Sequence, residues 1–462
     1  MAKLDLTNEN IPPVKAIMWL AWPVLLEQIL STLVSFADTA MVGQLGIQAT
    51  ASVSISNSFV FLLNSVILAL GTGLTTYVAR TIGAQDYEGA RAYIRHAFIL
   101  LGGVGLPIVS ATCLLHRQIP RWMGAEPEIL DAAAGYLLIT SAFRIFIMAM
   151  MVLGSVFRGR GDTKTPLRVG FLVNVINIVG NYLLINPTHT VTLFNRSFTV
   201  PGAGWGVTGA AVSTGFSWFV GGSILAFLLF TKKDPSRISL QDSFKADPAL
   251  IRRVVKLSLP AMLERASMSA SGIVVTRSIA VLGTVALGAN TVSLTAESFS
   301  YMPAFAFQMA ITTLVGQSLG AGKPDLAERY VKYTSHIGIF TMTLAGLGLY
   351  IFAEPLCRII TPDAEAVALA SRCLRIVSFI QPVQALTWIL GGALRGAGDT
   401  RFPFYITTFG NWCIRAAGVY VAIRLLKMSL PAAIIISNID NVVRCILMGL
   451  RVRQGKWKNA LS

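Results

Sequence analysis

The chain of 462 residues is rich in apolar side chains and poor in charged ones. Hydrophobic residues make up 54% of it and charged residues only 13%, whereas a soluble domain averages about 25% charged residues. This composition excludes an ordinary soluble domain and predicts a membrane protein that crosses the bilayer many times. The formal net charge of +16 does not indicate nucleic-acid binding, because most Lys and Arg lie in loops between apolar runs.

Apolar runs along the chain are each near or above the ~20 residues that a spanning helix needs. We expect twelve of them, at about residues 16–42, 51–79, 92–116, 129–157, 165–186, 205–231, 250–283, 286–319, 326–352, 365–394, 402–425 and 428–450. Lys and Arg concentrate in alternate loops, which places both termini in the cytoplasm. The N-terminal stretch has no short apolar segment with a cleavage site, so we expect no cleaved signal peptide.

The two halves of the sequence are related to each other. One ungapped offset of 237 residues (260 − 23) links Pro23 to Pro260, Glu27 to Glu264 and Gly83 to Gly320. Because a six-helix repeat keeps its orientation in the membrane, the halves form parallel repeats. We predict an all-α membrane protein with an N-terminal lobe in residues 1–231, a cytoplasmic linker in residues 232–253 and a C-terminal lobe in residues 254–462.

The first apolar run contains one carboxylate, Asp38. A charge inside hydrocarbon is costly unless it meets water, a partner or a proton. The repeat offset relates Asp38 to Val275, so this charge belongs to one half only. One interpretation places Asp38 at the outer water interface, and the other makes it a cation or proton site in the N-terminal lobe.

The fifth run places Asn174, Asn177 and Asn181 on one helical face. At about 1.5 Å per residue, Asp38 and Asn181 both fall in the outer half of the bilayer, and the sixth run carries Thr214 among small residues. Such an Asn face can hold helices together by hydrogen bonds, but a carboxylate and amide oxygens also suit a hard cation such as Na+. We predict these residues as the coupling site, with Asp38, Asn177 and Asn181 as Na+ ligands.

Four further charged residues in apolar runs are candidates for a substrate or gate role. They are Glu27, Glu264, Arg277 and Glu297. Because Glu27 and Glu264 are related by the repeat offset, a structural or gate role is favoured for both. Arg277 and Glu297 are predicted to form an intramembrane pair, since isolated charges are costly there.

Several paired motifs resemble those of the multidrug and toxic compound extrusion (MATE) family. They are P-x-x-x-E…D-T-A-M-V-G in the first run, the loop G-A-Q-D-Y-E-G-A-R with its twin G-A-G-K-P-D-L-A-E, and R-G-x-G-D-T at residues 158–163 and 395–400. The resemblance covers nearly the whole chain. It implies two six-helix bundles around a V-shaped central cavity, and export of organic, often cationic compounds against an inward flow of Na+ or H+.

The resemblance also bears on the coupling site. In relatives with a site in the N-terminal lobe, an Asp in the first helix, two positions four apart in the fifth and a Thr in the sixth build a cation pocket. Asp38, Asn177, Asn181 and Thr214 match these positions. The second position is Asp in some relatives and Asn181 here, which leaves one carboxylate instead of two.

The combined prediction is a secondary antiporter for multidrug efflux, not an enzyme, with Na+ or H+ as coupling ion and no other cofactor. We expect a small-molecule substrate and a lipid bilayer as its partners, and a monomer in the plasma membrane (the bacterial inner membrane). A lipid-linked precursor flippase of a related superfamily is one alternative, although most basic residues lie in loops rather than in a cavity. A membrane scaffold or sensor is another, against which the buried Asp38 and the Asn face argue.

Overall fold

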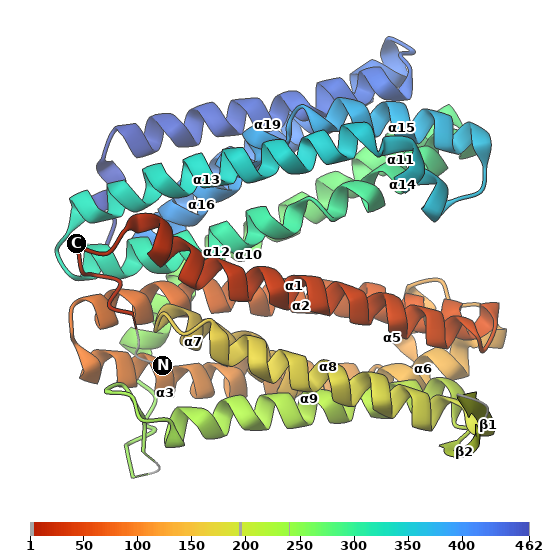
Figure 1. Cartoon of the computed structure of the whole chain (residues 1–462), viewed down its shortest axis with the longest axis horizontal. Helices are drawn as coiled ribbons and strands as arrows, with labels where there is room; N and C mark the ends of the chain where they lie inside the picture. Colours follow the sequence, from red (N-terminus) through yellow and green to blue (C-terminus); the bar gives the residue numbers. More distant parts are fainter. Residues whose placement is uncertain (1–3, 194–195, 240, 462) are drawn as a thin grey trace. The chain divides into compact units, whose positions relative to one another are not determined.

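The computed structural model describes residues 4–193, 196–239 and 241–461, and its helices join end to end into twelve rods (Figure 1). The single-helix rods are α1 (Pro13–Gly43), α2 (Ile47–Gly83), α8 (Lys164–Ile185), α9 (Gly206–Thr231), α10 (Pro248–Ile279), α13 (Pro324–Ile351) and α19 (Leu430–Arg453). The composite rods are α3 (Tyr87–Leu100) with η1 (Leu101–Gly105) and α4 (Leu106–Leu114); α6 (Pro127–Ala142) with α7 (Arg144–Gly159); α11 (Thr284–Ser298) with α12 (Tyr301–Gly320); α15 (Ala364–Ser378) with α16 (Gln381–Ala397); and α17 (Arg401–Phe409) with η3 (Gly410–Ala416), α18 (Ala417–Tyr420) and η4 (Val421–Leu425). Each predicted apolar run falls on one rod, in the same order.

Short helices lie between the rods or follow them: α5 (Gln118–Trp122), η2 (Ala280–Leu282), α14 (Ala353–Ile360) and η5 (Lys456–Asn459). In the described part of the chain, six helices are long and apolar enough to cross a membrane by themselves. Up to eight spans are obtained when the bent pairs α6–α7 and α15–α16 each count as one. The remaining rods include α2 and α10, which are unbroken helices, so breaks alone do not account for the difference.

The two bent pairs occupy equivalent positions in the repeat. The bend is 49° between α6 and α7 and 56° between α15 and α16. The repeat offset relates Arg144, the first residue of α7, to Gln381, the first residue of α16. The break is therefore a feature of the six-helix repeat itself.

A β-hairpin that the sequence analysis did not predict joins α8 to α9 (Figure 1). Its strands β1 (Pro187–Leu193) and β2 (Arg196–Ala203) pair antiparallel, with an irregularity between Pro187 and His189. The Thr- and Val-rich sequence of β1 is typical of strands, but the segment lies between two apolar runs and is too short to give a signal of its own in a search for spanning helices.

By internal contacts the chain divides into two compact units. Unit 1 comprises Met1–Leu25, Thr75–Gln85 and Lys256–Ser462, and unit 2 comprises Leu26–Leu74 and Asp86–Val255. Helix α1 thus contributes to both units, and its division falls just after Pro23, which cannot donate a backbone hydrogen bond. The predicted lobe boundaries at residues 231 and 254 rest on the sequence repeat and stay a prediction.

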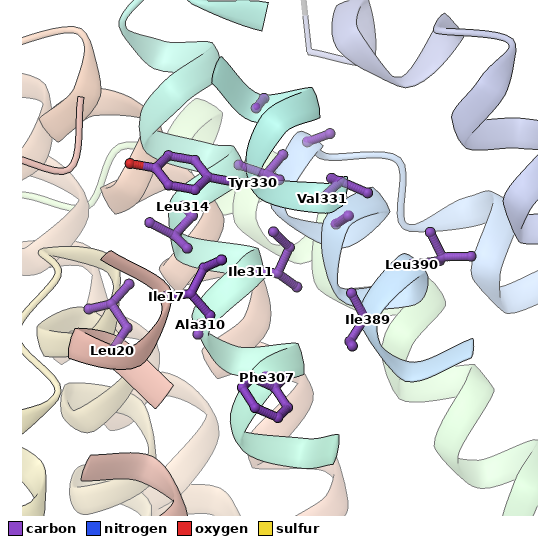
Figure 2. Packing of buried hydrophobic residues seen from close by; sticks show 14 of the residues in the cluster. Ile17, Leu20, Phe307, Ala310, Ile311, Leu314, Tyr330, Val331, Ile389 and Leu390 are labelled. Atoms are coloured by element: carbon purple, nitrogen blue, oxygen red, sulfur yellow. The ribbon is translucent and has the colours of Figure 1, made fainter. Parts of the chain in front are cut away.

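The core of unit 1 is built by α1, α12, α13 and α16 (Figure 2). Ile17 and Leu20 from the first part of α1 belong to the same buried cluster as Ile311 of α12, Tyr330 of α13 and Ile389 of α16. The Tyr330 hydroxyl also donates to the Leu6 carbonyl over 2.9 Å. The N-terminal segment is therefore anchored in unit 1 by apolar burial and by this bond.

The predicted linker, residues 232–253, packs against helices of unit 2. Arg160 Nη2 donates to the Ser236 carbonyl over 2.6 Å, and Arg91 Nη2 donates to the Pro235 carbonyl over 3.0 Å. The backbone N–H of Asp247 donates to His96 over 2.9 Å. Helix α10 begins at Pro248, so the last part of the predicted linker is already helical.

Within unit 1, α2 and α12 cross closely at two glycines that the repeat offset relates. A Cβ on Gly83 would lie 2.0 Å from the Gln317 carbonyl oxygen, and a Cβ on Gly320 would lie 2.0 Å from the Arg80 carbonyl oxygen. Arg80 and Gln317 are related by the same offset, so the contact is reciprocal. A local two-fold axis therefore relates the ends of the two helices, as parallel repeats require.

Gly320→Ala is expected to destabilise the protein by about 1–3 kcal/mol, because the new methyl group meets backbone that cannot rotate away. Gly348→Ala is the matched control, since nothing lies within 4 Å of its Cβ position in α13 and Ala favours a helix over Gly. Melting temperatures of the purified variants measure the difference. Equal melting temperatures for the two variants would contradict the close crossing.

Candidate functional site

The ends of α1 and α8 and the start of α9 bring the predicted coupling residues together in unit 2. Helices α8 and α9 lie side by side (Figure 1). A Cβ on Gly180 would lie 2.4 Å from Ser213 Oγ, and a Cβ on Gly209 would lie 2.4 Å from the Leu184 carbonyl oxygen. Small residues at these positions let the two helices approach closely, so that side chains from both reach one place.

Asp38 accepts hydrogen bonds from side-chain amides of α8. Asn181 Nδ2 donates to Asp38 Oδ1 over 2.6 Å, and the side-chain amide of Asn177 lies 3.2 Å from Thr214 Oγ1. Asn177 is 4% and Asn181 1% exposed, while Asp38 is half-buried. The structure therefore brings together the four residues Asp38, Asn177, Asn181 and Thr214.

The hydrogen bonds around Asn177 fix the orientation of its side-chain amide. Nδ2 donates to both oxygens of Asp38, over 2.8 and 3.1 Å, and the amide oxygen accepts from Thr214 Oγ1 over 3.2 Å. The reverse orientation would set the amide oxygen against the carboxylate, with two acceptors facing each other. Asn177 therefore connects Asp38 of α1 to Thr214 of α9.

The available oxygens have the chemistry of an alkali-cation site. Asn181 Oδ1 is buried without a hydrogen-bond partner. Among the residues that the structure describes, no group of three or more His, Cys, Asp and Glu could hold a metal ion. One carboxylate, amide oxygens and a hydroxyl are hard, weakly charged ligands, which fit Na+ or a protonated Asp38 better than a transition metal.

Asn174 lies one turn before Asn177 on α8 and is half-buried. In the described part of the chain it forms no hydrogen bond to Asp38, so the structure separates it from the four residues above. Tyr136 of α6 lies close enough to interact electrostatically with Asp38. Sequence reasoning did not single out Tyr136, because an aromatic residue within an apolar run gives no signal of its own.

The two repeat-related glutamates pair with repeat-related arginines. Glu264 accepts two hydrogen bonds from Arg395 Nη2, over 2.7 and 2.9 Å. Glu27 lies 3.8 Å from Arg158, and its Oε2 is buried without a partner. Arg158 and Arg395 open the doubled R-G-x-G-D-T motif, so each half has one Glu–Arg pair of its own. This geometry supports the structural or gate role that the repeat favours over a substrate role.

The predicted pair of Arg277 and Glu297 is wrong. Arg277 is exposed and has no salt bridge in the described part of the structure. Glu297 is 5% exposed and accepts from Gln381 Nε2 over 3.3 Å. The carboxylate is thus bonded by Gln381 of its own unit and also interacts electrostatically with Arg415, neighbours that sequence spacing alone could not identify.

Comparisons with known proteins agree with the fold and the repeat. The family model MatE matches residues 23–183 and 260–421, two segments that begin at Pro23 and Pro260, the pair that defines the repeat offset. The chain also has the twelve-helix, two-lobe membrane fold of solved MATE structures, one of them with a TM-score of 0.87 at 23% identity. The chain belongs to the MATE family.

The chain is similar over nearly its whole length to other proteins of this kind. It is 28% identical over 462 residues to the "Probable multidrug resistance protein NorM" of Thermotoga maritima, covering 98% of this chain and 95% of that protein. It is 25% identical over 443 residues to the "Uncharacterized transporter YisQ" of Bacillus subtilis, covering 95% and 94%. A solved outward-facing structure of a multidrug resistance MATE family transporter has the same fold, with a TM-score of 0.88 at 23% identity and 98% of each chain covered.

Proposed function

We propose that this protein is a secondary antiporter that exports small organic, often cationic amphiphilic compounds in exchange for Na+ or H+ by alternating access. The observation that carries the proposal is the pocket in which Asp38 meets Asn177, Asn181 and Thr214. A half-buried carboxylate beside an unpartnered amide oxygen is a group that a bound cation or a proton would stabilise. Membership of the MATE family and the similarity to a probable multidrug resistance protein support the efflux assignment.

The amide donors around Asp38 suggest how loading is linked to conformation. In the unloaded pocket Asn177 and Asn181 of α8 donate to Asp38 and connect α8 to α1. A cation or proton on Asp38 competes with these donors for the carboxylate oxygens. The contact between α1 and α8 then changes in strength, so the ion binds one conformation more tightly than the other.

The cellular setting is part of the proposal. We infer that the protein acts as a monomer in the plasma membrane, the bacterial inner membrane. Both termini would lie in the cytoplasm, because Lys and Arg concentrate in alternate loops. The substrate would bind in the V-shaped cavity that the family resemblance implies. Besides the substrate, the proposal requires one small partner, the Na+ or H+ that binds at Asp38.

The alternatives have weaker support. A lipid-linked precursor flippase needs a strongly cationic cavity for phosphates, whereas most Lys and Arg of this chain lie in loops. The family match does not favour it. A non-transporting scaffold would have no need of a carboxylate and amides at the coupling position.

Transport by the purified protein in proteoliposomes tests the proposal. A fluorescent cationic dye is followed while an inward Na+ gradient or an inward proton gradient is imposed separately, with protein-free liposomes as control. We expect dye export under one gradient and little under the other, which also identifies the coupling ion. Absence of gradient-driven dye movement under both conditions would refute the antiporter assignment.

A further inference from the structure

Unit 2 contains a buried arginine that the proposed function does not use. Arg144 is 0% exposed and begins α7 at the break after α6. None of its Nε, Nη1 and Nη2 atoms has a hydrogen-bond partner in the described structure. A guanidinium group stays charged in proteins, and a buried charge without a partner is strongly destabilising.

A second unpartnered donor lies beside this arginine. Ser141 precedes Arg144 by three residues, is 0% exposed and has no hydrogen-bond partner for its Oγ. The titratable groups that influence Arg144 are Tyr136 and Cys113, whose side chains are ordinarily neutral near pH 7. The break between α6 and α7 thus carries one positive charge, on Arg144, and one hydroxyl, on Ser141. Among the described residues, no acidic side chain pairs with either of them.

The repeat shows what is missing at this place. The offset relates Arg144 to Gln381 and Ser141 to Ser378, at the equivalent break between α15 and α16. There, Gln381 donates to Glu297 Oε1 over 3.3 Å and accepts from Ser300 Oγ over 2.9 Å. The C-terminal half therefore places a carboxylate of its own at the break, supplied by α11.

The N-terminal half has no such carboxylate. The residue related to Glu297 is Val60 of α2, which is apolar and 8% exposed. Asn64 is related to Tyr301, a hydrogen-bond partner of Glu297, and its Oδ1 is buried without a partner. A contact between Arg144 and this amide oxygen would satisfy one N–H group but would not neutralise the charge.

We propose that a small monovalent anion, chloride or a carboxylate the size of formate, binds to Arg144 and Ser141 at the α6–α7 break. It replaces the carboxylate that Glu297 supplies in the other half. Complete burial of both side chains limits the site to a small ion, and the donors are the N–H and O–H groups that anions prefer. Tyr136 interacts electrostatically with both Arg144 and Asp38, but no residue of the Asp38 pocket is a ligand in this proposal, which does not depend on the proposed transport function.

Melting of the full-length purified protein tests this site. Na+ concentration, pH and ionic strength are held constant while gluconate, which is too large for the site, is replaced stepwise by chloride or by formate. A ligand that binds only the folded state raises the melting temperature with its concentration. We expect a saturating rise with chloride, with formate or with both, and the stronger of the two identifies the ion. Equal melting temperatures in all three anions would mean that water satisfies the donors, and would overturn the proposal.

Two variants that copy the C-terminal half make the test specific. Arg144→Gln removes the charge and Val60→Glu supplies an internal carboxylate, so each should abolish the anion dependence. Ser141→Ala removes one donor and should weaken the apparent anion affinity by about tenfold. Arg117→Gln is the matched control, because Arg117 is 58% exposed and pairs with Asp131; it should keep the wild-type response.

The variants also keep the proposal open to contradiction if one of them fails to fold. Val60→Glu and Ser141→Ala act on different helices, and either one decides the question without Arg144→Gln. An anion response that is unchanged in the folded variants would place the bound ion elsewhere and overturn the assignment. This test measures melting temperature and not dye transport. A negative result would therefore rule out the anion site without contradicting the antiporter proposal.

Discussion

Asp38→Asn is expected to reduce gradient-driven dye export by about 100-fold, the upper range of a coupling free energy of a few kcal/mol. The substitution preserves the size of the side chain, and its amide can still bond to Asn181 and Asn177. It removes the carboxylate that these amides contact. A neutral group cannot exchange a cation or a proton between the two sides of the membrane, so the helices lose their response to the gradient.

Asp131→Asn is the control for this prediction. Asp131 is 81% exposed and pairs with Arg117 over 2.7 Å, and exposed pairs of this kind contribute little. We expect wild-type export from Asp131→Asn in the same proteoliposomes, with the amounts of reconstituted protein matched. Equal export rates for Asp38→Asn and Asp131→Asn would show that the carboxylate in the pocket is not the coupling group.

Glu264→Gln is expected to lower the free energy of unfolding by about 3–5 kcal/mol, as removal of one partner from a buried ion pair does. The side chains of Glu264 and Arg395 are 7% and 14% exposed. Arg265 and Arg444 also interact electrostatically with Glu264. Loss of this carboxylate therefore leaves buried positive charge uncompensated in unit 1.

Glu27→Gln provides the comparison within the same molecule. Glu27 lies farther from its arginine, at 3.8 Å, and is 29% exposed. It also has an unpartnered carboxylate oxygen, so neutralising it relieves part of its own cost. We expect a loss of stability clearly smaller than that of Glu264→Gln, measured by thermal or denaturant unfolding in detergent. A larger loss for Glu27→Gln would contradict the assignment of the stronger pair to the C-terminal half.

Much of this architecture follows from periodicity and from the repeat. Twelve apolar runs, one offset and the Asn face of α8 are properties of the local sequence, and each has a direct counterpart in the structure. The convergence of Asp38 with Asn181 could be predicted because both helices are long and straight enough for depth to be counted along them. Two residues at the same depth in the membrane can be expected to lie close together even when the packing of their helices is not known.

Contacts that depend on side-chain direction across helices could not be predicted in this way. The repeat identified Glu264 and Arg395 as members of related sets, but it could not show that they face each other. The predicted pair of Arg277 and Glu297 rests on charge alone. In the structure, Glu297 instead accepts a hydrogen bond from Gln381. The bend at Arg144 depends on a break that apolar runs do not reveal, so the unpartnered guanidinium was not recognised.

Saturable binding of the coupling ion to the purified protein tests the Asp38 pocket most directly. Radioactive Na+ binding and proton uptake are measured at equilibrium in the absence of dye, for the wild type, Asp38→Asn and Asp131→Asn. We predict saturable binding of one of the two ions by the wild type and by Asp131→Asn, and its loss in Asp38→Asn. Undiminished binding of that ion by folded Asp38→Asn would contradict the pocket as the coupling site.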